Sequence, residues 1–250
     1  MRAINDAIAM THRNVLRIFR TPQLLVFSTI QPVMFVLLFN YVFGGSIRTP
    51  GVHYVDYLIP GILVQTVSFG ASATAIGLAD DLSRGMVDRF RSLPMSRSAM
   101  LAGRTLADLV RAMVVVTIVL CVGFLVGFRP DGGALRVLAG AGIVLLFGFS
   151  LAWVFSCVAL LVKDPETAQT AGFLPLFPLV FASSIFTTTR SMPDWLASFA
   201  DHQPITQVCN ATRALMLGGD AGPPVLRSLA WSLGIIAVFA PLAVTLYRRI

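Results

Sequence analysis

The stretch VLAGAGIVLLFGFSLAWVFSCVALLV, residues 137–162, carries no charged side chain. A helix rising 1.5 Å per residue needs about 20 residues to cross roughly 30 Å of bilayer hydrocarbon, so this stretch is long enough to span. Other uninterrupted charge-free intervals occur along the chain, and together they predict an all-α integral membrane protein. The full set of intervals is 21–47, 57–79, 112–128, 137–162, 167–189 and 228–247.

The composition points to the same solvent. Hydrophobic residues make up 56% of the 250 residues and charged residues 12%, and the mean hydropathy is +0.79. Soluble domains carry roughly 25% charged residues, and a soluble fold of this size has no way to hide so much apolar surface. The net charge of +7 is spread between apolar intervals, which favours membrane topology and anionic lipid headgroups as its explanation over nucleic acid.

The intervals predict six transmembrane helices in a single domain covering residues 1–250. The interval 112–128 is short and is extended to 107. Six crossings place both termini on one side, and that side receives 13 of the 19 basic residues. By the positive-inside rule, both termini are predicted to lie in the cytoplasm of a cell with the protein in its cytoplasmic membrane. The predicted spans are 23–44, 57–79, 107–128, 137–162, 168–189 and 228–247.

Two segments outside the spans have helical patterns. In residues 4–20, apolar side chains recur at near-helical spacing opposite Arg13, Arg17 and Arg20, which predicts an amphipathic helix on the inner leaflet. The segment 190–227 contains two helix starts at prolines and a stop at a Gly-Gly pair, which predicts short extracellular helices before the last span.

The most charged stretch is SRGMVDRFRSLPMSR, residues 83–97. From Leu82 to Leu93 an apolar stripe at helical spacing lies beside a charged one, and Pro94 ends the pattern. We expect a short cytoplasmic amphipathic helix at 82–94, between the second and third spans. Two interpretations remain open: an ordinary positive loop that anchors topology, or a docking element for a cytoplasmic partner.

These residues lead to a family. The pattern Arg84-Gly85-Met86…Arg89-Phe90-Arg91-Ser92-Leu93-Pro94 resembles the cytoplasmic loop of ABC-2-type exporter permeases, near the daunorubicin/doxorubicin-resistance group. A second match lies at Met192-Pro193-Asp194-Trp195-Leu196, followed by His202-Gln203-Pro204 and by Arg213-Ala214-Leu215. It is similar to the extracellular segment that precedes the last helix in the same family. Together the two motifs and the six spans extend the resemblance over the whole chain.

The resemblance implies a concrete assembly. Such permeases pair as two six-helix halves, as a homodimer or with a paralogue, and bind two copies of an ATP-binding cassette ATPase. The 4–20 helix would be the connecting interface helix. The coupling helix would contact the ATPase through Arg84, Gly85, Met86, Asp88, Arg89, Phe90, Arg91, Leu93 and Pro94. The outer helices would shape an exit gate with Pro193, Trp195, Gln203, Pro204 and Arg213.

The motor is expected on another chain. The sequence contains no Gly-x-x-x-x-Gly-Lys-Ser/Thr motif, and its only lysine, Lys163, follows Val162. ATP and Mg²⁺ are therefore expected on the partner ATPase, with no cofactor, metal or catalytic residue in this chain.

Other functions remain as alternatives. The first is an ABC-2 exporter of lipid-linked glycan or polysaccharide. An ion-coupled secondary transporter is disfavoured because the spans lack central ionisable residues, and a membrane enzyme because the histidines and carboxylates do not cluster. A non-transporting scaffold is disfavoured by polar residues and prolines within the spans.

Those polar residues and prolines are the candidate path: Gln31, Pro32, Gln65, Pro175 and Pro178. In lipid, a polar or freed backbone group needs a partner from another helix or an inner path. Two interpretations stay open, helix–helix hydrogen bonding and contact with cargo. A path without fixed charge suits amphiphilic or apolar cargo, such as a drug, an antibiotic or a lipid.

Overall fold

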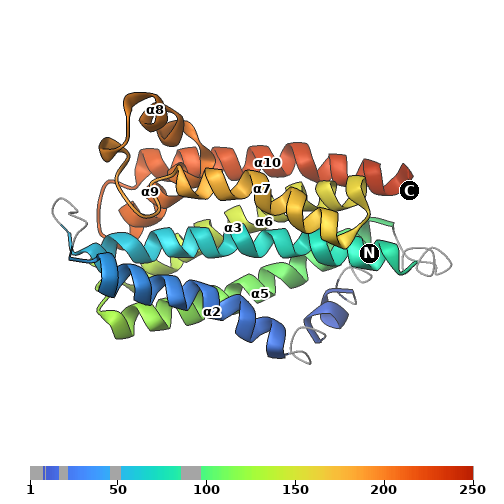
Figure 1. The fold of residues 1–250 in the computed structure, drawn as a ribbon, viewed down its shortest axis with the longest axis horizontal. Coiled ribbons are helices and arrows are strands. Elements are labelled where there is room, and N and C mark those ends of the chain that lie inside the picture. The colour runs from blue at the N-terminus through green and yellow to red at the C-terminus, as the bar shows by residue number, and fades with distance from the viewer. Residues whose placement is uncertain (1–7, 9, 17–21, 46–51, 86–96, 250) are drawn as a thin grey trace.

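The computed structural model describes residues 8, 10–16, 22–45, 52–85 and 97–249. Within these ranges the chain is helical between its turns and has no strand, which confirms the predicted all-α class (Figure 1). The elements are α2 Pro22–Leu38, the π-helix η1 Phe39–Phe43, α3 Tyr54–Ser83, α5 Arg97–Val126, α6 Gly133–Val162, α7 Pro165–Phe181, the 3₁₀ turn η2 Thr189–Ser191, α8 Asp194–His202, α9 Pro204–Met216 and α10 Gly222–Arg249.

Four of these helices are long and apolar enough to cross a bilayer: α3, α5, α6 and α10. Residues Ser28–Phe43 of α2 and η1 form a shorter apolar helix, and α7 has 17 residues. The four long helices agree with a multi-pass membrane protein, and the count of six spans stays a prediction.

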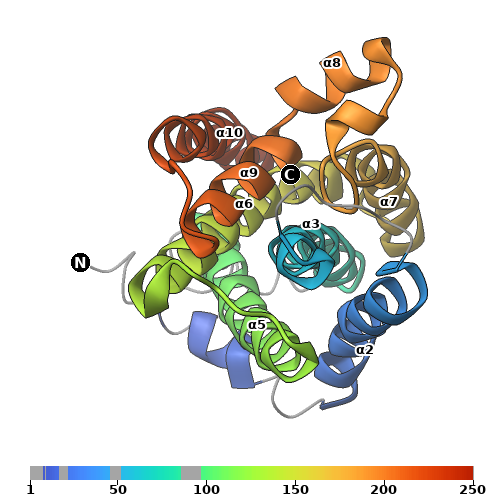
Figure 2. The same cartoon turned by 90° about the vertical axis from the view of Figure 1, so that its left-hand side faces the viewer.

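Helix α3 occupies the centre of the bundle. Viewed along the long axis, α2, α5, α6 and α7 surround it, while α10 packs outside against α6 and α9 (Figure 2). Within an apolar 18-residue stretch of each helix, the buried share is 61% in α3 and 67% in α6, but only 22% in α5 and 11% in α10. Helices α3 and α6 therefore form the packed interior, and α5 and α10 present apolar side chains outward.

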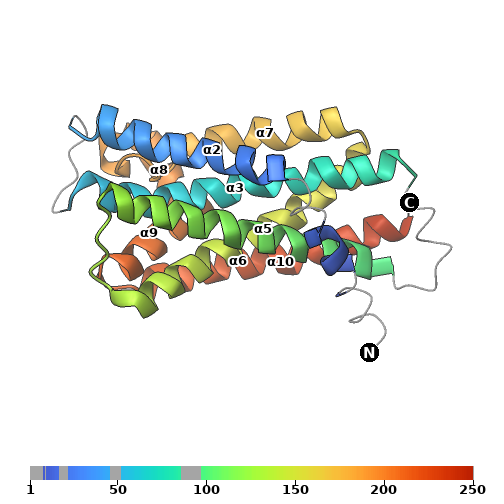
Figure 3. The same cartoon turned by 90° about the horizontal axis from the view of Figure 1, so that it is seen from below.

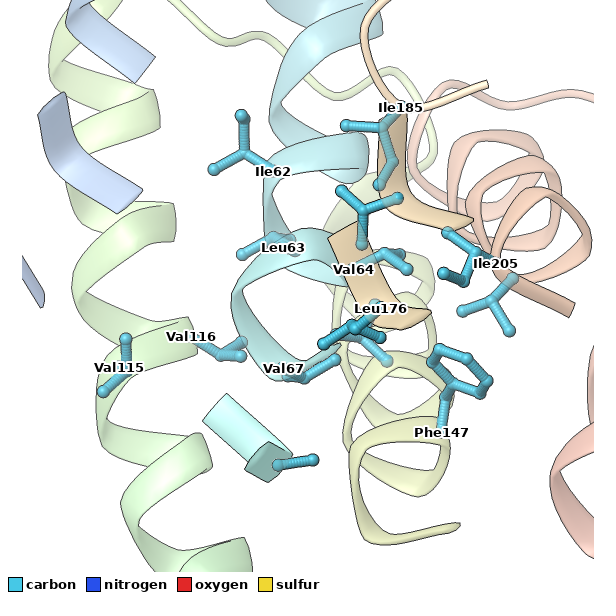
Figure 4. Close-up of a cluster of buried hydrophobic side chains, with 14 of the residues drawn as sticks. Ile62, Leu63, Val64, Val67, Val115, Val116, Phe147, Leu176, Ile185 and Ile205 are labelled. Carbon is cyan, nitrogen blue, oxygen red and sulfur yellow. The ribbon is translucent and has the colours of Figure 1, made fainter. Parts of the chain in front are cut away.

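The core that holds these helices together is made of branched aliphatic side chains around α3 (Figure 4). Leu63 and Val64 on α3 are fully buried, and Ile185 and Ile205 reach the same cluster from the far end of the sequence. Burying one such side chain from water stabilises a fold by about 1.5–3 kcal/mol. Where lipid is the solvent, close packing between the helices provides the stabilisation instead.

Helix α7 begins at a side-chain cap and ends earlier than expected. The carboxylate of Asp164 accepts hydrogen bonds from the backbone N–H of Thr167 at 2.8 Å and from its hydroxyl at 2.6 Å, which lowers the pKa of Asp164. The helix stops at Phe181, whereas the predicted span runs to residue 189. The reason is that residues 182–186 leave the helix and their carbonyls bind α3 and α9 instead.

The two ends of the bundle differ. Helices α8 and α9 lie at one end, with the turns that follow α5 and α7 (Figure 1). The ends of α3 and α10 lie at the other, near the helical residues 10–16 (Figure 3). We name these the α9 end and the Arg84 end.

The predicted coupling helix 82–94 falls largely outside the described residues. Leu82 and Ser83 form the last turn of α3, and Gly85 has a φ of +67°, a left-handed conformation that glycine adopts without strain. The chain thus turns at Arg84 and Gly85, so a separate helix cannot begin at 82. Met86, Asp88, Arg89, Phe90, Arg91, Leu93 and Pro94 lie outside the described residues, as do the two ends of the predicted 4–20 helix.

Candidate functional site

At the α9 end, the guanidinium of Arg213 holds residues 182–186. Its Nη2 donates to the carbonyls of Ser184 at 2.6 Å and Ile185 at 2.9 Å, and its Nη1 donates to the Ser184 hydroxyl at 3.2 Å. Its Nε donates to the carbonyl of Tyr57 on α3 at 3.0 Å. We call Arg213, Tyr57 and residues 182–186 the arginine clamp.

The clamp is closed by the aromatic ring of Tyr57. The guanidinium carbon Cζ of Arg213 lies 3.6 Å from the centroid of this ring, and the Tyr57 hydroxyl donates a hydrogen bond to the Ser184 carbonyl at 2.9 Å. Arg213 is 8% exposed, and no carboxylate of the described residues pairs with it. Carbonyl dipoles and a ring face therefore compensate this buried charge, a role that suits a planar guanidinium with five donors.

Other elements hold the same loop. The Thr206 hydroxyl accepts from the backbone N–H of Ser184 at 3.1 Å, and the amide of Gln203 donates to the Ala182 carbonyl. The ring of Phe186 stacks on Phe39 of η1 with centroids 4.4 Å apart. Residues 182–186 are thus fixed by α2–η1, α3 and α9 together.

The predicted gate residues divide in two. Gln203 and Arg213 meet at the clamp, but Trp195 on α8 is 74% exposed and takes no part in it. Pro193 is the N-cap of α8, and Pro204 is the first residue of α9. These two prolines therefore set where the short helices begin.

Between α2, α3, α5 and α6 lies a cavity of about 180 Å³. It brings together three of the predicted path residues, namely Gln31, Pro32 and Gln65. The other two, Pro175 and Pro178, lie within α7, which does not line the cavity, and both are exposed. The predicted path therefore separates into a cavity group and two prolines on the surface of α7.

The cavity also holds an ion pair. Within α5, Nη2 of Arg111 lies 3.4 Å from Oδ1 of Asp108. Both side chains also bind α3: Asp108 accepts a hydrogen bond from the Thr74 hydroxyl at 2.7 Å, and Arg111 donates one to the Gly70 carbonyl at 2.7 Å. The side chains of Arg111 and Asp108 are 13% and 15% exposed. The i, i+4, i+7 spacing of Arg104, Asp108 and Arg111 in the sequence indicates a polar face on this helix, but it does not indicate that the face is buried.

Another ion pair joins α5 to α3 nearer the Arg84 end. Arg104 on α5 donates to Asp81 on α3 at 2.6 Å, and Asp81 is 3% exposed. With the Thr74–Asp108 and Arg111–Gly70 hydrogen bonds, this pair fastens the C-terminal half of α3 to α5.

This pair depends on Gly77. A Cβ at this position would overlap the guanidinium of Arg104, so Gly77→Ala is expected to displace Arg104 and to break its ion pair with the buried Asp81. Breaking a buried pair costs about 3–5 kcal/mol, which is measurable as a lower melting temperature in detergent. In an Asp81→Asn background the same substitution should cost much less, and equal costs in both backgrounds would contradict the coupling.

Comparison with known proteins finds relatives along nearly the whole chain. Residues 6–217 match the family model described as ABC-2 type transporter. The chain is 35% identical over 250 residues to a daunorubicin resistance ABC transporter permease protein of Streptomyces coeruleorubidus, covering 99% of this chain and 88% of the relative. It is 29% identical over 251 residues to a probable doxorubicin resistance ABC transporter permease protein of Mycobacterium tuberculosis, covering 98% and 89%.

A more distant relative is a putative transport permease of Pyropia yezoensis, 23% identical over 218 residues and covering 85% of this chain and 74% of the relative. The family match spans the clamp, the cavity and the paired ends of α3 and α5. This chain is accordingly a member of the ABC-2 type transporter family, with the all-helical, apolar architecture of its permease component.

Proposed function

We propose that this chain is the permease half of an ATP-powered exporter that moves an amphiphilic or apolar molecule out across the cytoplasmic membrane. The observation that carries the proposal is the match along nearly its whole length to permeases named for daunorubicin and doxorubicin resistance. The cavity within the helical bundle supports it as well. The charges in its wall, Asp108 and Arg111, form an ion pair with each other, so the cavity suits an uncharged part of the cargo.

The proposed topology has six spans with both termini in the cytoplasm. The last turns of α3 and α10 and the helical residues 10–16 share the Arg84 end, as an even number of crossings requires (Figure 3). Four arginines belong to segments at the α9 end, namely the turn between α5 and α6, the start of α6, η2 and the start of α10, and this end would face outward (Figure 1). They are Arg129, Arg136, Arg190 and Arg227.

Force would enter through the connection between α3 and α5. The family implies an ATP-binding partner, and we propose two such subunits serving a pair of permease halves, each docking at residues 82–94. One ion pair, one hydroxyl–carboxylate hydrogen bond and one arginine–carbonyl hydrogen bond fasten α3 to α5, so a push on their connection would move the two helices as a unit. The cavity between them lies in the path of that motion.

The proposal is tested by reconstitution. Inverted vesicles that contain this chain and its cognate ATPase subunit are expected to take up daunorubicin, used as the probe, only when ATP is present. Vesicles without the ATPase subunit should take up none. ATP hydrolysis by this chain alone, or uptake that survives ATP depletion and collapses with the proton gradient, would refute the assignment.

Docking is tested by charge reversal. Replacing Arg84 and Arg91 together with glutamate is expected to abolish ATP-stimulated uptake while the permease still inserts, because like charges placed in an interface cost several kcal/mol. Pull-down of the ATPase subunit and vesicle uptake measure the effect. The matched control reverses Arg190 and Arg227, two exposed arginines on other segments, and should retain uptake; normal uptake by the first pair of substitutions would remove the docking role.

A further inference from the structure

The cavity has the size of a ring rather than of a whole amphiphile. Its volume is about 180 Å³, and an apolar cavity of about 150 Å³ in a helical protein holds one benzene molecule. On α3 its wall runs from Gln65 to Thr74, about 13 Å along the helix axis at 1.5 Å per residue. One ring with a substituent fits such a space.

One part of the cavity wall is aromatic and the rest is mixed. Phe35 of α2, Phe69 of α3 and Phe149 of α6 all line it, so faces or edges of three rings border the space from three helices. Ring–ring contacts of this kind favour an aromatic guest over a flexible alkyl chain.

The decisive residue is Gln65. It lines the cavity, is 3% exposed, and neither its amide oxygen nor its amide nitrogen has a hydrogen-bond partner in the described part of the chain. Buried amides are normally paired, because an unpaired donor and acceptor lose their hydration without compensation. Gln65 thus offers one donor group and one acceptor that no helix uses.

The two charged residues of the cavity wall do not need a charged ligand to compensate them. Asp108 is bound by Thr74 and Arg111, and Arg111 also donates to the Gly70 carbonyl. Asp108 and Arg111 therefore already have hydrogen-bond partners. Among the described residues, the buried polar group of the cavity wall that lacks one is the neutral amide of Gln65.

We propose that this cavity binds an uncharged aromatic ring of the cargo bearing a hydroxyl or amide group, which exchanges hydrogen bonds with Gln65. The inference rests on the proposed export function and assigns the class of substrate group to a site within one permease half. A hydroxyl fits because it donates to the Gln65 oxygen and accepts from its nitrogen.

The test uses the full chain in lipid nanodiscs with two probes of equal ring size, 4-fluorophenol and 4-fluorotoluene, followed by ¹⁹F NMR. Empty nanodiscs give the lipid background. Saturable binding of 4-fluorophenol is expected, at least tenfold tighter than that of 4-fluorotoluene. Gln65→Leu, close in shape and apolar, is expected to remove this preference.

Two further variants complete the design. Ser68→Ala, on the same helix, removes a buried hydroxyl that bonds to the Val64 carbonyl outside the cavity, and should leave the phenol preference intact. Ala73→Leu fills the cavity from another position on its wall and should weaken both probes, so the proposal stays testable if Gln65→Leu fails to fold.

Absence of saturable binding, or equal binding of the two probes, would overturn the proposal. Because the binding assay needs no ATPase, these outcomes leave the export function untouched. In the reconstituted vesicles, Gln65→Leu is expected to raise the KM for daunorubicin uptake more than it lowers the maximal rate. Unchanged uptake would show that the cavity is off the cargo path, whereas lack of uptake by the unaltered protein would refute the export function instead.

Discussion

Replacing Arg213 with methionine is expected to lower the melting temperature of the protein and to abolish export. The substitution removes four hydrogen bonds and the contact with the Tyr57 ring. Orphaned buried acceptors cost about 1–3 kcal/mol each, so a loss of roughly 2–5 kcal/mol of folding free energy is expected. Thermal denaturation in detergent and vesicle uptake measure the two effects.

Two controls separate the clamp from general effects of charge. Arg213→Lys keeps the charge but has no planar fork to reach three carbonyls and a ring, so it should restore little. Arg190→Met removes an exposed arginine from η2 and should change neither measurement. Stability and export close to those of the unaltered protein in Arg213→Met would show that residues 182–186 do not need the clamp.

Gly61→Ala is expected to open the same contact from the side of α3. A Cβ at Gly61 would overlap the Ile185 carbonyl oxygen and lie 3.1 Å from the Arg213 guanidinium. A backbone oxygen cannot rotate away as a side chain can, so α3 and residues 182–186 must separate. Such overpacking costs about 1–3 kcal/mol, and we expect a lower melting temperature together with reduced export.

The matched control lies on the same helix. A Cβ at Gly70 would meet open space, so Gly70→Ala should stabilise α3 by up to about 1 kcal/mol through helix propensity alone. The two glycine substitutions are therefore expected to shift the melting temperature in opposite directions. A shift of the same sign and size in both would contradict the close approach at Gly61.

The helices could be located from the sequence because hydropathy and length are local properties. The charge-free intervals 57–79, 137–162 and 228–247 lie inside α3, α6 and α10. The boundary of α7 was missed because nothing in residues 182–189 marks a helix end: they are uncharged, and their departure from the helix depends on Arg213, 28 residues from Ile185. The prolines Pro175 and Pro178 sit inside the helix and do not end it.

The candidate site was only partly predictable for a related reason. Gln31, Gln65 and Arg213 could be singled out as polar residues in apolar or motif-bearing surroundings, but their partners could not. The partners of Arg213 include a backbone carbonyl 156 positions away, and backbone carbonyls carry no sequence signal. The burial of Asp108 and Arg111 could not be predicted from the sequence either, because it depends on how α5 lies against α3.

The sequence by itself determined that this chain is a set of apolar helices with a charged connection after the second predicted span. Its residue patterns also identified the family. Only the tertiary structure decided that α3 lies at the centre, that Gln31 and Gln65 share one cavity and that Arg213 clamps residues 182–186. The physical reason is that a helix apolar on all sides has no periodic mark for its inner face, so its neighbours are chosen by packing and by a few long-range polar contacts.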